Sequence, residues 1–312
     1  MNILHIKLKS RVLFLTTDLV ALMPETAESG AAEAASTKTI ELKAAESEAA
    51  ERKPAEPKAA GLKVLWLLHG ASGDCSEWLT NTHLLKLLEG RTDLMVVMPS
   101  ALNSDYGSYP DFGTGYDFPG FFFEELMPFV RGQLGGSDRP EDNFIAGASM
   151  GGYGALMLGL LRPELFGGIG ALGASMRESS FLEPYRRMSG SEFREYALAH
   201  RREFPTEYGS AEYGIKPKEI NVIAKYPTVQ DFLDSPECMY NRFPKLVERG
   251  ILPPIYMMVG TEDLFYEPVR RFEALTQKLG TDKVTFDFAA GYGHEIRLWD
   301  EKLKDLLAFF GI

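Results

Sequence analysis

Short apolar runs alternate with longer segments of helical spacing from Gly61 to the end of the chain. Each run has the length of a strand and is apolar throughout, as in strands covered on both faces. This alternation predicts βα units and a largely parallel, doubly covered sheet, an α/β fold. The expected strands are 64–68, 94–98, 143–147, 167–172, 255–260 and 284–288, and the expected helices lie around 78–89, 119–134, 150–161, 265–279 and 295–310.

Two stretches depart from this alternation. Residues 25–60 consist mostly of Ala, Glu, Lys and Ser. They offer too little apolar surface to offset the entropy cost of ordering, which favours a solvated linker or inserted loop over a docking site. Because Ala and Glu favour helix, a fluctuating exposed helix is the alternative. Residues 176–250 mix charged and aromatic side chains without a clear buried strand, and helical patterns occur around 191–203 and 236–249. We interpret them as a cap-like insertion near the functional edge of one domain, 1–312.

The amino-terminal segment imitates a secretory signal. Residues 12–23, VLFLTTDLVALM, follow Lys7, Lys9 and Arg11, but Asp18 and two threonines interrupt the apolar run. We therefore expect strands here. No run approaches the roughly 20 uninterrupted apolar residues of a transmembrane helix, so a soluble, cytoplasmic protein is expected.

Composition narrows the classes of partner. Of the 312 residues, 45% are hydrophobic and 12% aromatic, which excludes a wholly disordered chain. A net charge of −11 and a pI near 5.1 disfavour nucleic acid and membrane surfaces and favour a small or neutral ligand. The two cysteines, Cys75 and Cys238, show no metal-ligand spacing and are expected to be reduced thiols. No metal or cofactor is expected.

The most specific motif is Gly147-Ala-Ser149-Met-Gly151, which follows one predicted strand and precedes a predicted helix. A sharp strand-to-helix turn needs small flanking residues, because the central residue is strained and the chain packs closely on both sides. Such a turn presents the Ser149 hydroxyl beside the helix amino terminus, where unpaired N–H groups face a developing oxyanion. Phosphate binding and simple tight packing are the alternatives, but no G-K-[ST] ending is present.

A serine nucleophile needs a base, and five histidines are available. His294 follows the last strand and opens the final helical segment, so it lies beyond a strand's carboxyl end, where catalytic groups gather in open parallel sheets. A surface histidine is the alternative. His69 ends a strand, which is also compatible with tight packing, while the remaining histidines lie in strand or helical patterns: His5, His83 and His200.

The group that orients the base should lie between Ser149 and His294 if this is an α/β-hydrolase. Asp263 meets this demand just after the strand IYMMV. Glu262 is adjacent but would point elsewhere in a turn, and Asp287 lies inside a strand. As an ordinary loop aspartate, Asp263 would only cap the helix that follows.

An oxyanion hole needs two N–H groups, one of them from the residue after the nucleophile, here Met150. The loop after strand 64–68 supplies the other, because Gly70 lets the chain turn so that the Ala71 amide faces the site. An ordinary glycine turn remains the alternative at this point.

Together these residues resemble the esterase D-like group of α/β-hydrolases, most closely its tributyrin esterase branch. The agreement runs in the family's order through most of the chain: LLHGASGDCSEWL (67–79), VVMPSALNSDY (96–106), FFFEELMPFV (121–130), DNFIAGASMGGYGAL (142–156), VGTEDLFY (259–266) and GYGHEIRLWDEKLKDLLAFF (291–310).

The resemblance implies that Ser149 is the nucleophile, Asp263 the orienting acid and His294 the base, with oxyanion donors at Ala71 and Met150. It implies short acyl esters as substrates and, often, dimers or tetramers. Close relatives that hydrolyse S-formylglutathione carry His where this chain has Tyr153. That difference argues against glutathione thioesters as the main substrate.

The sequence thus predicts a serine carboxylesterase acting through an acyl-enzyme on a small ester. Candidate pocket walls are Trp78, Tyr106 and Tyr109, although aromatic residues are equally frequent in cores. The nearest alternative removes acetyl or feruloyl groups from plant polysaccharide. Acyl transfer to an alcohol and a non-catalytic binding scaffold are the further alternatives, and the presence of all three candidate residues disfavours the scaffold.

Overall fold

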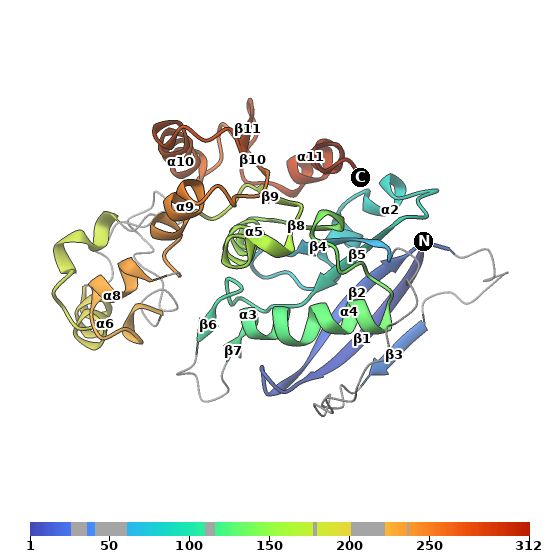
Figure 1. Cartoon of the computed structure of the whole chain (residues 1–312), viewed down its shortest axis with the longest axis horizontal. Helices are drawn as coiled ribbons and strands as arrows, with labels where there is room; N and C mark the ends of the chain where they lie inside the picture. Colours follow the sequence, from blue (N-terminus) through green and yellow to red (C-terminus); the bar gives the residue numbers. More distant parts are fainter. Residues whose placement is uncertain (26–35, 41–60, 110–115, 177–179, 201–221, 236) are drawn as a thin grey trace.

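A nine-stranded sheet forms the centre of the molecule, with the strand order β11-β10-β9-β8-β4-β5-β2-β1-β3 (Figure 1). The structure is a computed structural model. It describes residues 1–25, 36–40, 61–109, 116–176, 180–200, 222–235 and 237–312.

Six neighbouring strands run parallel and follow the predicted apolar runs. Their carboxyl ends therefore meet at one edge of the sheet, where loops can bring distant residues together. These strands are β4 (Lys63–Leu68), β5 (Leu94–Pro99), β8 (Asn143–Ala148), β9 (Gly168–Leu172), β10 (Ile255–Gly260) and β11 (Val284–Ala289).

The last apolar run is less buried than predicted. We expected every run to be covered on both faces, but β11 is the outermost strand and only Ala289 is fully buried in it. An edge strand has no neighbour on one side, so its side chains retain contact with solvent. The prediction of complete burial is therefore wrong for residues 284–288.

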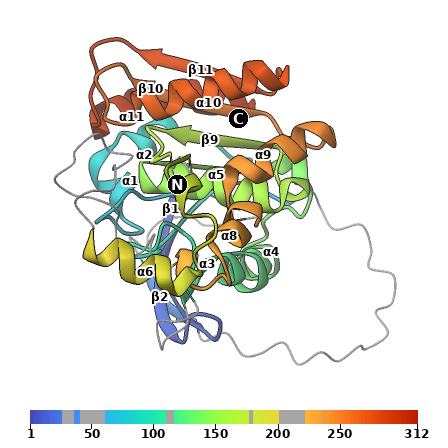
Figure 2. The same ribbon diagram turned by 90° about the vertical axis from the view of Figure 1, so that its left-hand side faces the viewer.

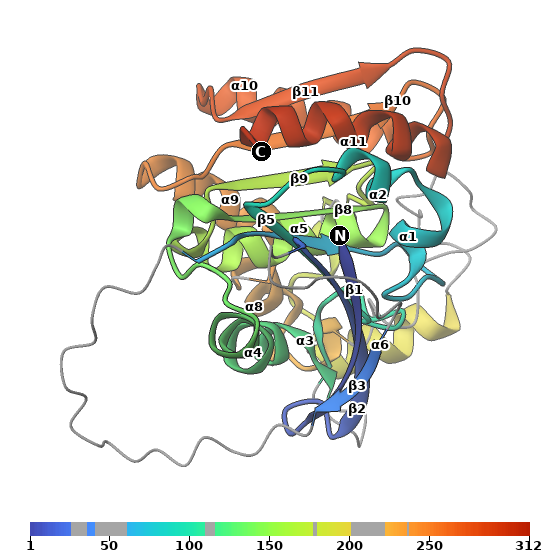
Figure 3. The same cartoon turned by 90° about the vertical axis from the view of Figure 1, so that its right-hand side faces the viewer.

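The amino-terminal strands complete the other half of the sheet. β1 (Asn2–Ser10) and β2 (Leu15–Met23) form an antiparallel hairpin, and β2 pairs antiparallel with β5. Their direction is turned strongly away from that of β9–β11, as the twist of a large sheet requires (Figure 3). The prediction of strands within 12–23 is confirmed.

One strand arises inside the segment that we expected to be a loop or linker. β3 (Ser36–Ile40) pairs parallel with β1 at the sheet's edge. Its residues Thr37, Thr39 and Ile40 are β-branched and favour extended backbone, a local signal that the surrounding Ala and Glu conceal. The rest of that segment, 26–35 and 41–60, lies outside the described residues.

Helices cover both faces of the sheet and separate two cores. One face is covered by helices whose apolar residues pack with Trp66 and Ile145, and the other by helices that pack with Leu65 and Leu67. The first group is α3 (Phe118–Gly120), α4 (Met127–Gln133), α5 (Met150–Leu161), α9 (Met239–Glu248) and α10 (Tyr266–Leu279), and the second is α1 (Glu77–Asn81), α2 (Leu84–Leu87) and α11 (Ile296–Phe310).

Two predicted helices are less regular than expected. The helix predicted around 78–89 is two short helices, because Thr82 adopts an extended backbone and its hydroxyl accepts the Leu84 N–H at 3.3 Å. The helix predicted around 119–134 contains a π-helical segment, Phe121–Leu126. Within the residues that the structure covers, no helix is long and apolar enough to span a membrane.

The stretch 176–250 divides into two parts. A 3₁₀ segment (Ser180–Tyr185), α6 (Gly190–Ala199) and α8 (Val229–Asp234) form a small core of their own. They lie beside the main body in Figure 1 and face the viewer in Figure 2. By contrast, α9 contributes Phe243 and Leu246 to the main core. The expected insertion therefore ends before α9, because the apolar face of that helix packs against α5 and α10.

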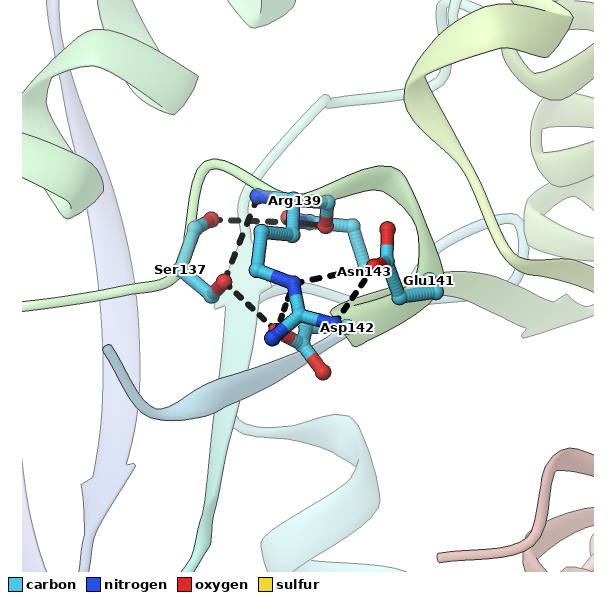
Figure 4. A network of polar contacts seen from close by, with 5 residues as sticks. All are labelled: Ser137, Arg139, Glu141, Asp142 and Asn143. Carbon is cyan, nitrogen blue, oxygen red and sulfur yellow. Dashed lines mark hydrogen bonds and ion pairs between the residues drawn. The ribbon is translucent and has the colours of Figure 1, made fainter. Parts of the chain in front are cut away.

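A polar network fixes the turn that leads into β8 (Figure 4). The buried Asn143 amide donates to the carbonyl oxygens of Ser137 and Arg139 at 2.9 and 2.8 Å. Its own oxygen accepts the Trp66 indole N–H from β4 at 3.2 Å. This network sets the start of the strand whose other end carries Ser149.

Candidate active site

Ser149 lies at the turn from β8 into α5 with φ 53° and ψ −117°, a positive-φ backbone conformation that a non-glycine residue rarely adopts. The turn is tight on both sides. A Cβ atom on Gly147 would overlap the backbone of Gly151, and a Cβ atom on Gly151 would overlap the Leu68 carbonyl oxygen. The two glycines are therefore required because the backbone approaches closely on both sides of the turn, as the motif predicts.

Strand β9 and the residues just after it hold this strained turn in place. The Ser149 N–H donates to the Leu172 carbonyl of β9 at 2.8 Å, and its own carbonyl accepts the Ser175 N–H at 3.1 Å. Fixed on both sides, the backbone presents the hydroxyl at the carboxyl edge of the sheet.

His294 lies in the loop between β11 and α11 and contacts the serine directly. Its Nε2 is 2.9 Å from the Ser149 Oγ, and its Nδ1 is 2.8 Å from an oxygen of Asp263. Phe265 and Trp299 pack edge-on against the imidazole, with ring centroids 5.1 and 5.0 Å away. These rings restrict its rotation.

Asp263 follows β10, is only 5% exposed, and uses both carboxylate oxygens. One accepts the Phe265 N–H at 2.8 Å and the other contacts the His294 Nδ1. A carboxylate can only accept, so the imidazole proton resides on Nδ1 and leaves Nε2 free to accept the serine proton. The structure thus brings the three sequence-predicted residues into one chain of hydrogen bonds.

The rival acids lie elsewhere. Glu262 is exposed, whereas the Asp287 carboxylate accepts the Tyr256 hydroxyl at 2.6 Å and the Lys302 ammonium at 2.7 Å. Neither is hydrogen-bonded to His294, whose ring nitrogens contact Asp263 and Ser149.

Gly173, which was not predicted from the sequence as a site residue, lies against the hydrogen-bonded pair Asp263 and His294. Its φ is +51°, and a Cβ atom there would lie 3.0 Å from the Trp299 Nε1 and 3.2 Å from the Asp263 Oδ2. It would also lie 3.5 Å from the His294 Nδ1. A glycine directly after a strand was the available signal, but the crowding depends on residues far away in the sequence.

The loop after β4 places a second free amide near the serine. A Cβ atom on Gly70 would lie 3.6 Å from the Ser149 Cβ, so the loop passes directly beside the serine side chain. In the described part of the chain, the Ala71 and Met150 N–H groups have no acceptor. Two unpaired amides, one at the amino terminus of α5, are the donors that an oxyanion requires.

Three buried side chains support this loop from behind. His69 accepts the Ala101 N–H at Nε2 (2.9 Å) and donates from Nδ1 to the Gly70 carbonyl (2.7 Å). Burial lowers the pKa of His69, which favours this neutral form. The Trp78 indole donates to the Leu68 carbonyl at 3.0 Å, and the Tyr106 hydroxyl donates to the His69 carbonyl at 3.2 Å.

These contacts change our expectation for the pocket walls. Trp78 and Tyr106 are 1% and 2% exposed, so they lie in the core behind the loop and not on an open wall. Burial raises the pKa of the Tyr106 hydroxyl well above its ordinary value, which keeps it a donor. Tyr109 lies in β6 (Ser108–Tyr109), and its side chain is outside the described part of the structure.

Comparison with known proteins supports the same fold and chemistry. A family model described as "Putative esterase" matches residues 47–213, more than half of the chain. The chain belongs to this esterase family. A curated relative, an acetyl esterase of Caldicellulosiruptor saccharolyticus, is 28% identical over 249 residues, covering 78% of this chain and 81% of the relative. The protein is a carboxylic ester hydrolase.

Solved structures establish the α/β-hydrolase fold of this esterase. A fluorophosphonate-binding serine hydrolase of Staphylococcus aureus superposes with a TM-score of 0.65 at 20% identity, covering 99% of this chain and 97% of the other. The S-formylglutathione hydrolase of the same organism gives 0.64 at 19% identity, covering 99% of both chains. A ferulic acid esterase gives 0.65 at 17% identity, covering 99% and 97%.

A polar pocket of about 300 Å³ adjoins the loop after β4 in this esterase. Its lining includes Ala71, Ser72, Gly73, Asp74, Glu77 and Thr80. Elsewhere, His83 contacts Asp300 and His200 contacts the Tyr196 carbonyl. Within the described ranges, no three His, Cys, Asp or Glu residues are grouped as metal ligands require.

Proposed function

We propose that this esterase hydrolyses short-chain acyl esters through an acyl-enzyme, with Ser149 as nucleophile. The observation that carries the proposal is a series of hydrogen bonds. It runs from the Ser149 Oγ through His294 to the buried Asp263 carboxylate, with contacts of 2.9 and 2.8 Å. An ordinary serine is a weak nucleophile, and a base oriented by a carboxylate is the arrangement that activates it.

The reaction follows from this order of groups. As the Ser149 oxygen attacks the ester carbonyl, its proton passes to the His294 Nε2, and the Asp263 carboxylate stabilises the resulting imidazolium. The tetrahedral oxyanion accepts hydrogen bonds from the N–H groups of Ala71 and Met150. The imidazolium then protonates the departing alcohol, and water releases the acid by the same steps in reverse.

We place the preferred acyl group among short chains, from acetyl to butyryl. Support comes from the curated relative, which is named an acetyl esterase. The same relative supports the second candidate, removal of acetyl or feruloyl groups from polysaccharide fragments. The ferulic acid esterase structure shares the fold.

Hydrolysis of p-nitrophenyl acetate, butyrate and octanoate by the purified protein and by Ser149→Ala tests the proposal. We expect the acetate and butyrate to react fastest and the variant to lose about 10⁴-fold or more of kcat. Ser191→Ala, on α6, is the matched serine control and should keep the wild-type rate.

Activity retained by a folded Ser149→Ala protein would contradict the assigned nucleophile. Absence of activity in both folded proteins, also toward acetylated and feruloylated sugars, would favour a binding scaffold. Ester formed from an added alcohol would instead identify acyl transfer.

A further inference from the structure

Glu77 is an acidic residue that the proposed reaction does not use, although it lies under the loop that carries Ala71. It is the first residue of α1. Its Oε1 accepts the Gly70 N–H at 2.8 Å, and its Oε2 occupies the space that a Cβ atom on Gly73 would need. The carboxylate therefore touches both ends of the turn from Gly70 to Gly73.

The Gly70–Ala71 peptide has only one orientation compatible with these contacts. Its carbonyl oxygen accepts from the His69 Nδ1 at 2.7 Å and from the Gly73 N–H at 3.3 Å. In a planar trans peptide the N–H points opposite to the carbonyl, and none of the peptides described in the structure is cis. The Ala71 N–H is therefore directed away from the His69 ring.

Gly70 itself needs an external restraint. Without a side chain, it could rotate about its own φ and ψ and swing the following peptide plane. The hydrogen bond from its N–H to Glu77 restrains the amino side of the residue, and the contacts of its carbonyl restrain the other side. Together they hold the Ala71 N–H in a single direction.

We propose that Glu77 is a positioning residue which, by accepting the Gly70 N–H, holds the Ala71 amide in place for the oxyanion. This inference rests on the proposed function, because it assigns Ala71 the role of oxyanion donor. Glu77 is half-buried, so its carboxyl is partly desolvated and forms a stronger hydrogen bond than an exposed one. The same burial raises the pKa of this carboxyl. Glu77 also lines the polar pocket, so solvent reaches one side of it.

Steady-state kinetics of Glu77→Ala, Glu77→Gln and the wild type test this role. We expect Glu77→Ala to lower kcat about 10- to 100-fold with KM within twofold, because an oxyanion donor acts mainly in the transition state. Glu77→Gln keeps an oxygen acceptor and should stay within about threefold of the wild type. Glu89→Ala is the matched control, because it removes an exposed acidic side chain that lies outside this pocket and makes no hydrogen bond to the loop, and it should stay within twofold.

Hydrogen exchange of the Gly70–Gly73 amides provides a readout that does not depend on activity. We expect about tenfold faster exchange in Glu77→Ala than in the wild type, and little change in Glu77→Gln. Unchanged kcat and exchange in Glu77→Ala, or an equal loss in Glu77→Gln, would overturn the proposal. An inactive wild type with fast exchange in Glu77→Ala would reject the esterase mechanism while retaining the positioning contact.

Discussion

Two residues of the site, Ser149 and Gly173, have positive φ angles for different reasons. At Ser149 the strained backbone (φ 53°) places a hydroxyl in front of His294, and hydrogen bonds with Leu172 and Ser175 maintain it. At Gly173 (φ +51°) the absence of a side chain leaves room for the Asp263–His294 contact. The first residue supplies a reactive group, and the second supplies space.

Gly173→Ala tests the importance of that space. The added methyl group would lie within 3.5 Å of Trp299, Asp263 and His294, so we expect it to displace the imidazole and lower kcat about 10- to 100-fold. Gly280→Ala is the matched control, because its φ of +66° carries similar strain in open space. It should lose about 1 kcal/mol of stability and keep its activity. Equal kinetics in the two folded variants would contradict the crowding argument.

His69 should make stability depend on pH. Its pKa is lowered by burial, so the unfolded chain binds a proton that the folded protein excludes. Its stabilising contribution is thus complete above the ordinary histidine pKa of about 6.5 and is lost as the pH falls below it, by up to about 1.4 kcal/mol per pH unit. Urea denaturation from pH 7.5 to 5 should give a flatter dependence for His69→Gln. Parallel curves would refute this assignment.

At the scale of elements, the neighbouring strands β8 and β4 are linked by a structural hydrogen bond and also carry loops that meet at the candidate site. Near their amino ends, Asn143 joins them through the Trp66 indole, and beyond their carboxyl ends Ser149 lies beside Gly70. The parallel register runs from Val64 opposite Asn143 to Leu68 opposite Gly147, so it determines which loop lies beside Ser149. A local change at the Asn143 end should therefore affect stability more than chemistry.

Asn143→Ala tests this separation. It leaves the buried Trp66 N–H and two carbonyl oxygens without their partner, so we expect the free energy of unfolding to fall by about 2–4 kcal/mol. Arg139→Ala removes only half-exposed ion pairs in the same turn and should cost less than about 1 kcal/mol. Urea denaturation measures both values. A large loss of kcat in folded Asn143→Ala protein would show that the two ends are coupled.

At the scale of the whole molecule, the site and β3, the strand described within the segment 25–60, lie at different parts of the sheet. The candidate catalytic residues follow β8, β10 and β11, whereas β3 is the outermost strand beyond β1 at the opposite side. Among the described residues of that segment, hydrogen bonds within the sheet join 36–40 to β1. We therefore propose that 25–60 supports no step of the reaction.

Replacing residues 27–58 with a short Gly/Ser linker tests this proposal. We expect kcat and KM for p-nitrophenyl butyrate to stay within twofold of the wild type, because the parallel strands that carry the site keep their neighbours. The melting temperature should fall slightly as β1 loses its edge partner. A large loss of activity in a folded product would show that the segment contributes to the site.

Local patterns in the sequence were sufficient to predict the parallel strands, most of the covering helices and the position of Ser149 at a strand-to-helix turn. Apolar runs record burial on two faces, and the spacing of Gly147 and Gly151 records close backbone approach within a few residues. These signals are short-range, so they can be recognised without knowing which segments meet.

Only the tertiary structure decided which distant residues meet. It placed Asp263 and His294 in hydrogen-bonding order beside Ser149, buried Trp78 and Tyr106 behind the loop, and packed α9 into the main core. It also showed β3 on the sheet edge and the contact of Glu77 with Gly70. Each depends on pairing and packing between segments far apart in the chain, which local composition and spacing do not encode.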